Sequence, residues 1–489
     1  MNVMRSSPLI IILLLFITAF CMPIMKKNKR VKILSGISLS LSLIFSVVNF
    51  INVLNNGPFS YRIGHYDSPW GISFYIGNVE SIMGVVFTLV ALLVMSYSYM
   101  TIEKEISKKR VNLYYTLMNL LLGSLLGIVF TNDLFNGFVF LEVSTLAGCG
   151  IIVIKDKKEN IKATLKYLVL SSLGSGLVLM GIAFIYPVSG YLDMDFIGKS
   201  ILSLEGGNRN LIVISASLFT IGLGVKSAMF PLHVWLPDAH SSAPSPSSAI
   251  LSALVLKPPV LFLIKILYKV YKIQILKEMG ILNILLVLGS IGMIGGSIFA
   301  MNQKEVKRVI AYSSVAQMGY IFYGIGLGSK LGVVMSIFHM IGHSLTKSAL
   351  FLIGGSMIKK TGSKYVKDLK GIGREMPITL GLFTLCALSM VGIPILPGFI
   401  SKWKLALATI ESGKIYLIGI ILLSSLLNVA YYFPIVINGY FGHENLEGKT
   451  YMSKELRKPK IIPMGILVIC VILTGVFSIQ IIDFISKGF

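Results

Sequence analysis

The sequence has few charged residues and few cysteines. Only 13% of its 489 residues are charged, and 21 residues are Asp or Glu. The four cysteines lie in separate apolar stretches without CxxC spacing: Cys21, Cys149, Cys386 and Cys470. This spacing gives no indication of a zinc or iron–sulfur site, or of disulfides. It predicts four buried, unpaired side chains that act as small apolar residues.

Long polar stretches are also missing, which excludes a soluble catalytic or nucleotide-binding domain within the chain. The composition is 55% hydrophobic, and the mean hydropathy is +0.81. Apolar runs of bilayer length recur from end to end, and about fourteen of them reach the ~20 residues that a membrane span needs. They begin near residues 8, 33, 80, 111, 133, 162, 211, 245, 279, 305, 330, 377, 413 and 460. The sequence therefore predicts an all-α polytopic membrane protein.

The first apolar run resembles a signal peptide, because one arginine precedes it within residues 1–25. The small residue of a cleavage site is missing, since Phe20 stands directly before Cys21. We therefore expect this segment to be retained as the first span.

Basic residues give the chain a formal net charge of +23. They cluster in alternate predicted loops, at residues 26–32, 104–110, 155–166, 304–308, 359–374 and 449–460. By the positive-inside rule these loops face the cytoplasm and both termini lie outside. One cluster on the predicted outer side disobeys the rule: Lys265, Lys269, Lys272 and Lys277. Either the topology shifts there, or that surface meets another subunit.

Two stretches interrupt the helical pattern. Residues 230–246 contain four prolines, and residues 393–399 contain two prolines and a glycine. Irregular backbone at membrane depth is tolerated only where it is buried in protein or lines a wet cavity. Two such breaks in corresponding places indicate an inverted-repeat transporter. We expect a single membrane domain over 1–489, with three helices in 1–110, repeats of five helices at 111–270 and 279–440, and a last helix at 460–486.

Seven ionisable residues fall inside predicted spans: Glu142, Lys226, Lys257, His339, His343, Lys347 and Lys402. A charge at bilayer depth costs roughly 2.5–3.5 kcal/mol on insertion scales. A series spread over both halves of one chain therefore predicts a path for ions, and for protons first.

Glu142 and Lys226 are predicted to form a switchable pair. A nearby carboxylate would hold the lysine protonated, and separation of the two would release its proton. The alternatives are a purely structural ion pair and a lysine that snorkels to the interface. Small residues around Lys226 favour close helix packing over a lipid-facing position. Lys257 is followed by Pro258 and Pro259, which would free carbonyls toward a cavity.

His339, His343 and Lys347 are spaced four residues apart and share one helix face. They predict a proton relay; structural histidines and a metal site are the alternatives, and no carboxylate or HExxH motif in this helix supports a metal. After the second break, we expect Lys402 to point inward and Lys404 to reach the surface. Polar side chains of another span would be available to water chains, although such serines often bond only their own backbone: Tyr312, Ser313, Ser314 and Gln317.

Four strings resemble the antiporter-like subunits of respiratory complex I and of Mrp cation/proton antiporters. They are LGVKSAMFPLHVWLPDAH at 223–240 with APSP at 243–246, EVKRVIAYSSVAQMGY at 305–320, HSLTKSALF at 343–351 and PGFISK at 397–402. The resemblance implies fourteen helices, two inverted five-helix repeats and a central polar axis. It also implies roles along that axis, as the fifth-helix glutamate, seventh-helix lysine, eighth-helix lysine, eleventh-helix histidine and terminal lysine, for Glu142, Lys226, Lys257, His343 and Lys402.

Three tracts look closer to the Mrp type, including the Mrp-like subunits of membrane-bound hydrogenases, than to the quinone-complex type: 138–144, 167–175 and 188–195. The chain has no lateral helix after the fourteenth predicted span, so it resembles the D-type antiporter subunits rather than the larger A-type ones. The Lys257-Pro-Pro sequence departs from the family, which usually has a small residue and Gly after this lysine.

The expected function is proton translocation within a multi-subunit membrane complex, by shifts between buried ion pairs. In an Mrp complex the chain would exchange protons for sodium; in a redox-driven complex it would pump while another subunit does the electron chemistry. The expected partners are other membrane subunits, protons, sodium ions in the Mrp case, and the lipid bilayer of a prokaryotic cell membrane, with no nucleic acid, cofactor or metal. The alternatives are a quinone-binding subunit of an NADH:quinone-type oxidoreductase, for which no flavin, haem or cluster motif is present, and a solute carrier that transports alone.

Overall fold

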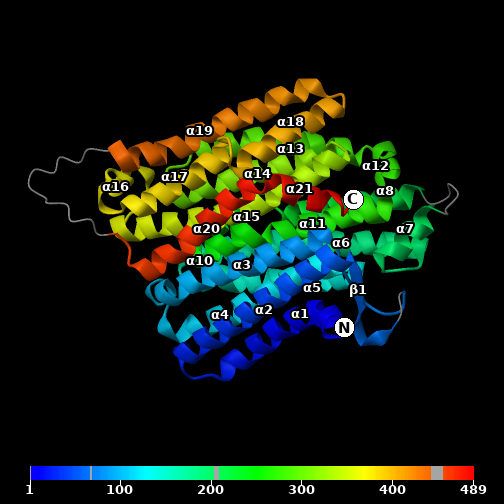
Figure 1. The fold of residues 1–489 in the computed structure, drawn as a ribbon, viewed down its shortest axis with the longest axis horizontal. Coiled ribbons are helices and arrows are strands. Elements are labelled where there is room, and N and C mark those ends of the chain that lie inside the picture. Colours follow the sequence, from blue (N-terminus) through cyan, green and yellow to red (C-terminus); the bar gives the residue numbers. More distant parts are fainter. Residues whose placement is uncertain (1, 67–68, 203–208, 442–454) are drawn as a thin grey trace, which may run out of the picture.

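The N-terminal part of the fold consists of three long helices and a small hairpin. The computed structural model describes residues 2–66, 69–202, 209–441 and 455–489. Strands β1 (Phe59–Arg62) and β2 (Ser73–Ile76) pair antiparallel between the second and third helices. We call the end of the bundle where they lie the hairpin end; it is on the right in Figure 1. The three helices are α1 (Asn2–Cys21), α2 (Asn28–Asn56) and α3 (Asn78–Thr101).

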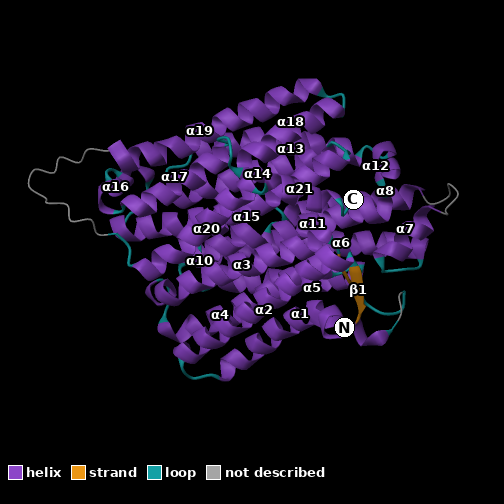
Figure 2. Ribbon diagram, in the orientation of Figure 1, coloured by secondary structure: helices purple, strands orange, loops and turns teal. Residues whose placement is uncertain are grey.

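The remaining helices run side by side along the length of the molecule (Figures 1 and 2). The middle of the chain forms α4 (Val111–Phe130), α5 (Leu134–Val153), α6 (Lys158–Ser189), α7 (Met194–Leu202), α8 (Arg209–Lys226), α9 (Leu236–Ser242), α10 (Ser245–Ile250) and α11 (Lys257–Lys265), with π-helical turns at Leu251–Val255 and Ile266–Tyr271. The rest forms α12 (Ile273–Glu278), α13 (Ile281–Met301), α14 (Val306–Gly326), α15 (Lys330–Thr361), α16 (Ile372–Glu375), α17 (Pro377–Val391), α18 (Pro397–Glu411), α19 (Ile418–Phe441), α20 (Lys458–Val476) and α21 (Ser478–Ser486).

The prediction of an all-α polytopic membrane protein is confirmed. Within the described residues, eleven helical segments are long and apolar enough to cross a membrane. The other three predicted spans correspond to α14, α15 and α17, and the total of fourteen stays a prediction. Helix α17 has only 15 residues because the second break ends it. The predicted last helix at 460–486 is instead two helices, α20 and α21, which meet at Phe477.

Helix α15 lies at the centre of the bundle. Every side chain from Gly332 to Met357 is buried, and the helix contacts α3, α10, α14, α17, α18, α20 and α21. A helix that is enclosed on all sides can carry polar groups on any face without exposing them to lipid. This enclosure explains why a low-hydropathy helix can sit inside a membrane protein.

Close packing of α13 against α14 fixes the position of α14 beside α15. A Cβ atom at Gly289 would lie 2.4 Å from the backbone nitrogen of Tyr323, and one at Gly319 would lie 2.5 Å from that of Met293. Only glycine allows the two backbones to approach this closely, which is typical of membrane helix interfaces.

Both predicted helix breaks are confirmed. Helix α8 ends at Lys226 and α9 begins at Leu236, while α17 ends at Val391 and α18 begins at Pro397. In the first break the indole of Trp235 donates a 3.0 Å hydrogen bond to the carbonyl of Val225. Carbonyls at the end of each interrupted helix are therefore available to side chains. The inverted relation between the two halves stays a prediction.

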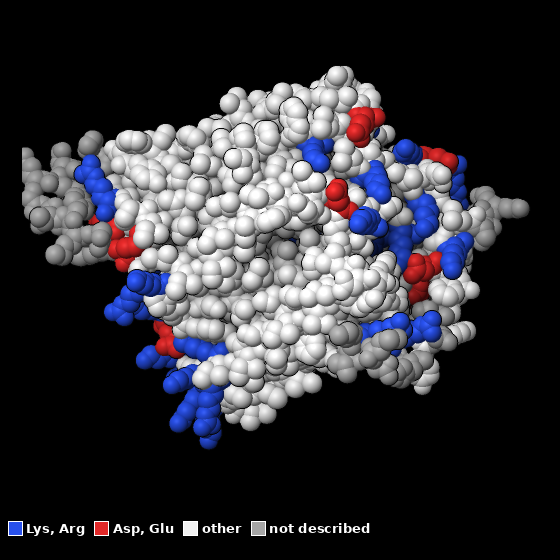
Figure 3. Space-filling view, in the orientation of Figure 1, with Lys and Arg blue, Asp and Glu red and all other residues white. Residues whose placement is uncertain are grey.

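On the face shown in Figure 3, charged residues gather at the two ends of the bundle, and a broad band without charge separates them. This distribution fits a bilayer wrapped around the middle of the helices. Residues 449–454 of the last predicted basic cluster lie outside the described residues. The prediction of four buried cysteines is wrong: Cys386 is buried, but Cys21 is exposed and the other two are partly exposed, because their helix faces point outward from the bundle.

Candidate functional site

Glu142 and Lys226 form an ion pair between α5 and α8. The distance from Glu142 Oε1 to Lys226 Nζ is 3.7 Å. Lys226 also donates to Thr145 Oγ1 at 2.6 Å and to the Leu141 carbonyl at 3.5 Å. Both of these partners belong to α5, so the ammonium at the end of α8 reaches across to the neighbouring helix. The predicted proximity of the two residues is therefore present in the structure.

The two partners of this pair differ in burial. The Lys226 side chain is 4% exposed, but that of Glu142 is 34% exposed. Glu142 shares its outward face of α5 with exposed apolar side chains at i−7, i−3 and i+4: Phe135, Val139 and Leu146. The Glu142 carboxylate therefore lies at mid-span on a surface that is otherwise suited to contact lipid or another membrane helix.

Lys257 is completely buried at the start of α11. Its ammonium donates to the carbonyl of Ser252 in the preceding π-helical turn. Pro258 and Pro259 lack the N–H groups that would otherwise bond carbonyls one turn earlier. The Ser252 carbonyl lies six residues before Pro258, so it is not one of the carbonyls that the prolines leave unbonded, and the effect predicted for the two prolines stays a prediction.

A chain of polar atoms links Lys257 to Lys347. The hydroxyls of Ser252 and Ser314 share a 2.9 Å hydrogen bond, and Ser314 donates to the Ile310 carbonyl at 3.2 Å. The same carbonyl accepts a 3.0 Å hydrogen bond from Lys347. Lys347 also donates to Ser313, and to the hydroxyl of Tyr432 at 3.1 Å. Serines of α14 thus do more than bond their own helix.

His339 and His343 stack along α15, with ring centroids 6.1 Å apart. Nδ1 of His339 shares a 2.8 Å hydrogen bond with Ser401. Its Nε2 and both ring nitrogens of His343 are buried without a protein hydrogen-bond partner among the described residues. Buried polar atoms are normally paired, so water or a transferred proton is the expected partner here.

Lys402 lies at the far end of this row, beside the second break. It is 5% exposed and donates to the carbonyls of Met390 and Val391 at 2.7 and 3.1 Å. Its ammonium is 4.9 Å from the ring centroid of Tyr320, and that ring is 5.7 Å from His339. Lys402 points inward and Lys404 is only partly buried, as predicted.

The structure therefore brings five of the seven predicted residues into one row. The row runs through Lys257, Lys347, His343, His339 and Lys402. The Glu142–Lys226 pair lies apart from it, and no hydrogen bond between described residues joins Lys226 to Lys257. Helices α8 and α11 nevertheless pack against each other.

Comparison with known proteins decides the family. Residues 131–428 match the family described as NADH:quinone oxidoreductase/Mrp antiporter, TM. The chain belongs to this family. It is 33% identical to the N subunit of the NADH-quinone oxidoreductase of Desulforudis audaxviator (strain MP104C), over 87% of this chain and 86% of that protein. It is 27% identical to the D subunit of the Na(+)/H(+) antiporter of Bacillus subtilis (strain 168), over 96% of this chain and 94% of that protein.

Solved structures of the family share the fold. A chain of the membrane-bound sulfane sulfur reductase, an archaeal respiratory membrane complex, superposes with a TM-score of 0.88 at 27% identity, covering 100% of this chain and 96% of that one. A chain of the Mrp complex from Dietzia sp. DQ12-45-1b gives the same TM-score at 21% identity, with coverage of 100% and 97%. Both of these structures are multi-subunit membrane complexes, so the relatives of this family member include subunits of larger assemblies.

Several residues that contact the ion pair or the row were missed from the sequence. They carry hydroxyl groups: Thr145 beside the ion pair, and Ser252, Tyr320, Ser401 and Tyr432 along the row. Their spacing carries no pattern, because their partners come from other helices. His240 in α9 is also fully buried with neither ring nitrogen bonded to protein in the described part of the chain. The only signal in the sequence that could have identified His240 is its position in the first proline-rich break.

Proposed function

We propose that this chain is the proton-translocating, antiporter-like subunit of a multi-subunit membrane complex. The observation that supports it is the buried row from Lys257 to Lys402, in which two adjacent histidines with unbonded ring nitrogens lie between Lys347 and Lys402. Nothing structural requires unbonded histidine nitrogens in a closely packed core, where an unsatisfied polar group costs about 1–3 kcal/mol. A chain of groups that accept and donate protons accounts both for the buried lysines and for the unbonded histidine nitrogens.

The ion pair at the beginning of the path supplies the switch. While Glu142 stays near Lys226, it favours the protonated form of the lysine. When the pair separates, Lys226 gives its proton to water between α8 and α11, and Lys257 accepts it. The proton then moves to Lys347 through water beside the Ser252 and Ser314 hydroxyls, along the histidines and on to Lys402. Each step breaks one N–H or O–H bond and forms another, so the energy for transport enters only as a change of ion-pair distance.

The exposure of Glu142 supports the proposal that a neighbouring membrane subunit covers this face of α5. A partly exposed carboxylate at mid-span would be costly against lipid. A partner helix that offers a hydrogen-bond donor or a cation at the same depth removes this cost. We assign the partner to the same complex, because the relatives are subunits of such complexes.

We favour the Mrp branch, with exchange of protons for sodium, in a prokaryotic cell membrane with both termini outside. The 27% identity to the D subunit of an antiporter over nearly the whole chain supports this choice. A quinone-linked complex is the second candidate, since the 33% identity to the N subunit of an NADH-quinone oxidoreductase favours it. The same row would carry protons in both, and only the driving reaction would differ.

Transport by the whole native complex in inverted vesicles tests the proposal. We expect Glu142→Gln to abolish proton transport at equal assembly. The matched control is Glu103→Gln, which removes a carboxylate of similar exposure (38%) from the surface pair with Lys32 and should leave transport intact. Unchanged transport in Glu142→Gln would mean that the pair is structural. Dependence of transport on a sodium gradient, rather than on NADH and quinone, would identify the Mrp branch.

A further inference from the structure

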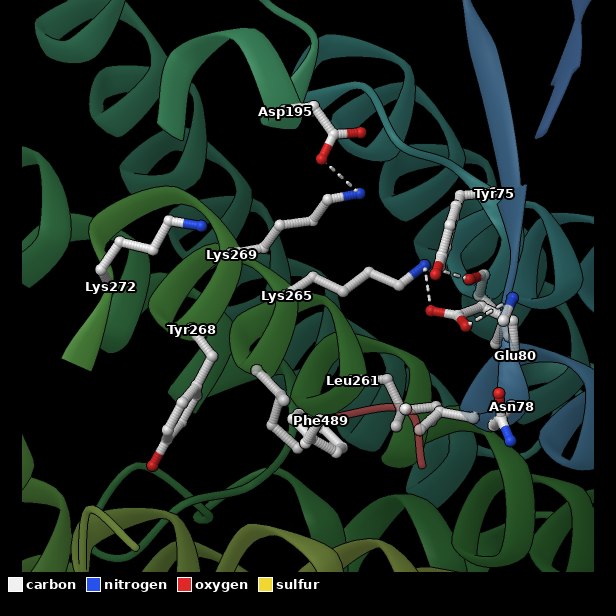
Figure 4. Close-up of a pocket in the computed structure, with 15 residues that line it drawn as sticks. Tyr75, Asn78, Glu80, Asp195, Leu261, Lys265, Tyr268, Lys269, Lys272 and Phe489 are labelled. Atoms are coloured by element: carbon white, nitrogen blue, oxygen red, sulfur yellow. Dashed lines mark hydrogen bonds and ion pairs between the residues drawn. The ribbon is translucent and has the colours of Figure 1, made fainter. Parts of the chain in front are cut away.

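A cavity of about 360 Å³ opens at the hairpin end of the bundle. It lies between the start of α3, the end of α4, α7 and the C-terminal part of α11 (Figure 4). Lys265, Lys269 and Lys272 line it. They belong to the cluster that disobeyed the positive-inside rule. Two of these lysines are paired with acidic residues that also line the cavity, and the side of the membrane on which the cluster lies stays a prediction.

Lys265 marks the deep end of the cavity. Its ammonium is 3.1 Å from Glu80 Oε1, and the two side chains are 12% and 8% exposed. Lys265 also donates to the carbonyls of Val129 and Thr131, at the end of α4. The other carboxylate oxygen of Glu80 accepts a 3.0 Å hydrogen bond from the Gly77 N–H, which fixes the side chain at the start of α3.

Lys269 lies one turn nearer the surface. It is 3.0 Å from Asp195 Oδ1 and donates to Asn132 Oδ1 at 2.6 Å. Its ammonium also lies 4.4 Å from the ring centroid of Tyr75. The Asp195 side chain is 48% exposed, so the cavity is open at this level. Polar groups therefore continue from the surface inward to the Glu80–Lys265 pair.

The cavity points toward the row of the functional site. Lys257, Leu261 and Lys265 occupy positions i, i+4 and i+8 of α11 and so lie along one side of the helix. The backbone rise from Lys257 to Lys265 is about 12 Å, with Leu261 midway. Leu261 lines the cavity and is 3% exposed. Leu261 therefore lies between the two lysines on this side of α11, at the wall of the cavity nearest the row.

We propose that this cavity is an aqueous vestibule at which Lys265 exchanges protons with the outside, and that Leu261 is the barrier between Lys265 and Lys257. The inference rests on the proposed function. In the outward direction the ammonium of Lys265 gives a proton to water and becomes a neutral amine. The ammonium of Lys257 then returns one proton to Lys265 through water when Leu261 changes rotamer. Glu80 and Asp195 balance the charge of the two vestibule lysines in the resting state, and the hydroxyl of Tyr75 and the ammonium of Lys272 face the same water.

Lys265 would have the same contacts if it only stabilised the end of α4. The variant Lys265→Arg separates this structural role from a role in proton transfer. Arginine keeps the positive charge and the donors for Glu80 and the carbonyls, but it does not lose its proton at any working pH. We expect the variant to assemble normally and to lose proton transport by roughly 100-fold, the size of a typical proton-transfer contribution. The matched control is Glu278→Gln, which removes an exposed carboxylate paired with Arg209 near the same end and should transport normally.

The outcomes distinguish this inference from the proposed function. If Lys265→Arg transports normally while Glu142→Gln does not, the vestibule is not on the path and the proposed function stands. If both variants transport normally, the proposed function fails as well. If Lys265→Arg does not assemble, access to Leu261 decides the question.

Access is measured with Leu261→Cys in a chain whose exposed and partly exposed cysteines, Cys21, Cys149 and Cys470, are replaced by serine. We expect a membrane-impermeant thiol reagent to label Cys at this position in the assembled complex from the outer side. We also expect zinc or another thiol ligand that fills the vestibule to slow transport in this variant alone. Labelling only from the cytoplasmic side, or no labelling at all, would overturn the inference.

Discussion

The distance between Glu142 and Lys226 should set the transport rate in a graded way, which Glu142→Asp tests. Aspartate is one methylene shorter, so the carboxylate would lie about 1.5 Å farther from Lys226, at about 5.2 Å instead of 3.7 Å. At an effective dielectric constant of about 20, the Coulomb attraction falls from about 4.5 to about 3.2 kcal/mol. The loss of about 1.3 kcal/mol corresponds to about a tenfold smaller population of the proton-loaded pair. Screening through the exposed side of Glu142 makes this figure an upper estimate.

The assay is proton uptake by inverted vesicles that hold the native complex, compared at equal assembly and at a limiting proton concentration. We expect Glu142→Asp to lie between wild type and Glu142→Gln, with a reduction of up to about tenfold. Two results would refute the reasoning. Transport equal to wild type would show that the distance is irrelevant, and complete loss would show that the shape of the side chain, not its charge at a distance, matters.

Three further predictions concern packing, pH and the end of the row. Gly289→Ala should lower the melting temperature of the complex, since overpacking typically costs 1–3 kcal/mol; Gly176→Ala, whose Cβ would meet nothing within 4 Å, should not. Burial raises the pKa of Glu105, but Lys307, Lys155 and the Ser245 N–H lower it more, so it lies below its usual 4.5. The charged carboxylate of Glu105 should stabilise the complex fully above pH 4.5, and this stabilisation should be lost as the pH falls through the lowered pKa. The melting temperature of Glu105→Gln should therefore not show this loss at acid pH. Lys402→Met should abolish proton uptake by vesicles, whereas Lys404→Met should preserve it.

Much of the axis was predictable because buried charge is costly. Lys226, Lys257 and Lys347 were identified by that cost alone, and the two breaks followed from proline and glycine at membrane depth. The helix starts were predictable from apolar runs, since the bilayer fixes their length. The last span was predicted as one helix because the sequence stays apolar on both sides of Phe477, where the structure divides it.

Contacts between distant segments could not be predicted from local patterns. The Glu80–Lys265 pair depends on α3 and α11 meeting at the hairpin end, although 185 positions of the chain separate the two residues. The Ser252–Ser314 bond likewise depends on how α14 packs. The exposure of Glu142 was unexpected, because the hydropathy of α5 does not show which of its faces the bundle covers.

The enclosure of α15 has a consequence for how the chain is made. During synthesis α15 emerges before α17, α18 and α20, three of the helices that cover it. Until these helices are made, its histidines and Lys347 face either lipid or the insertion machinery. Helix α15 therefore cannot enter the bilayer as an independent stable unit. It must be held until its later neighbours arrive, so a chain that stops after residue 361 should be degraded rather than retained in the membrane.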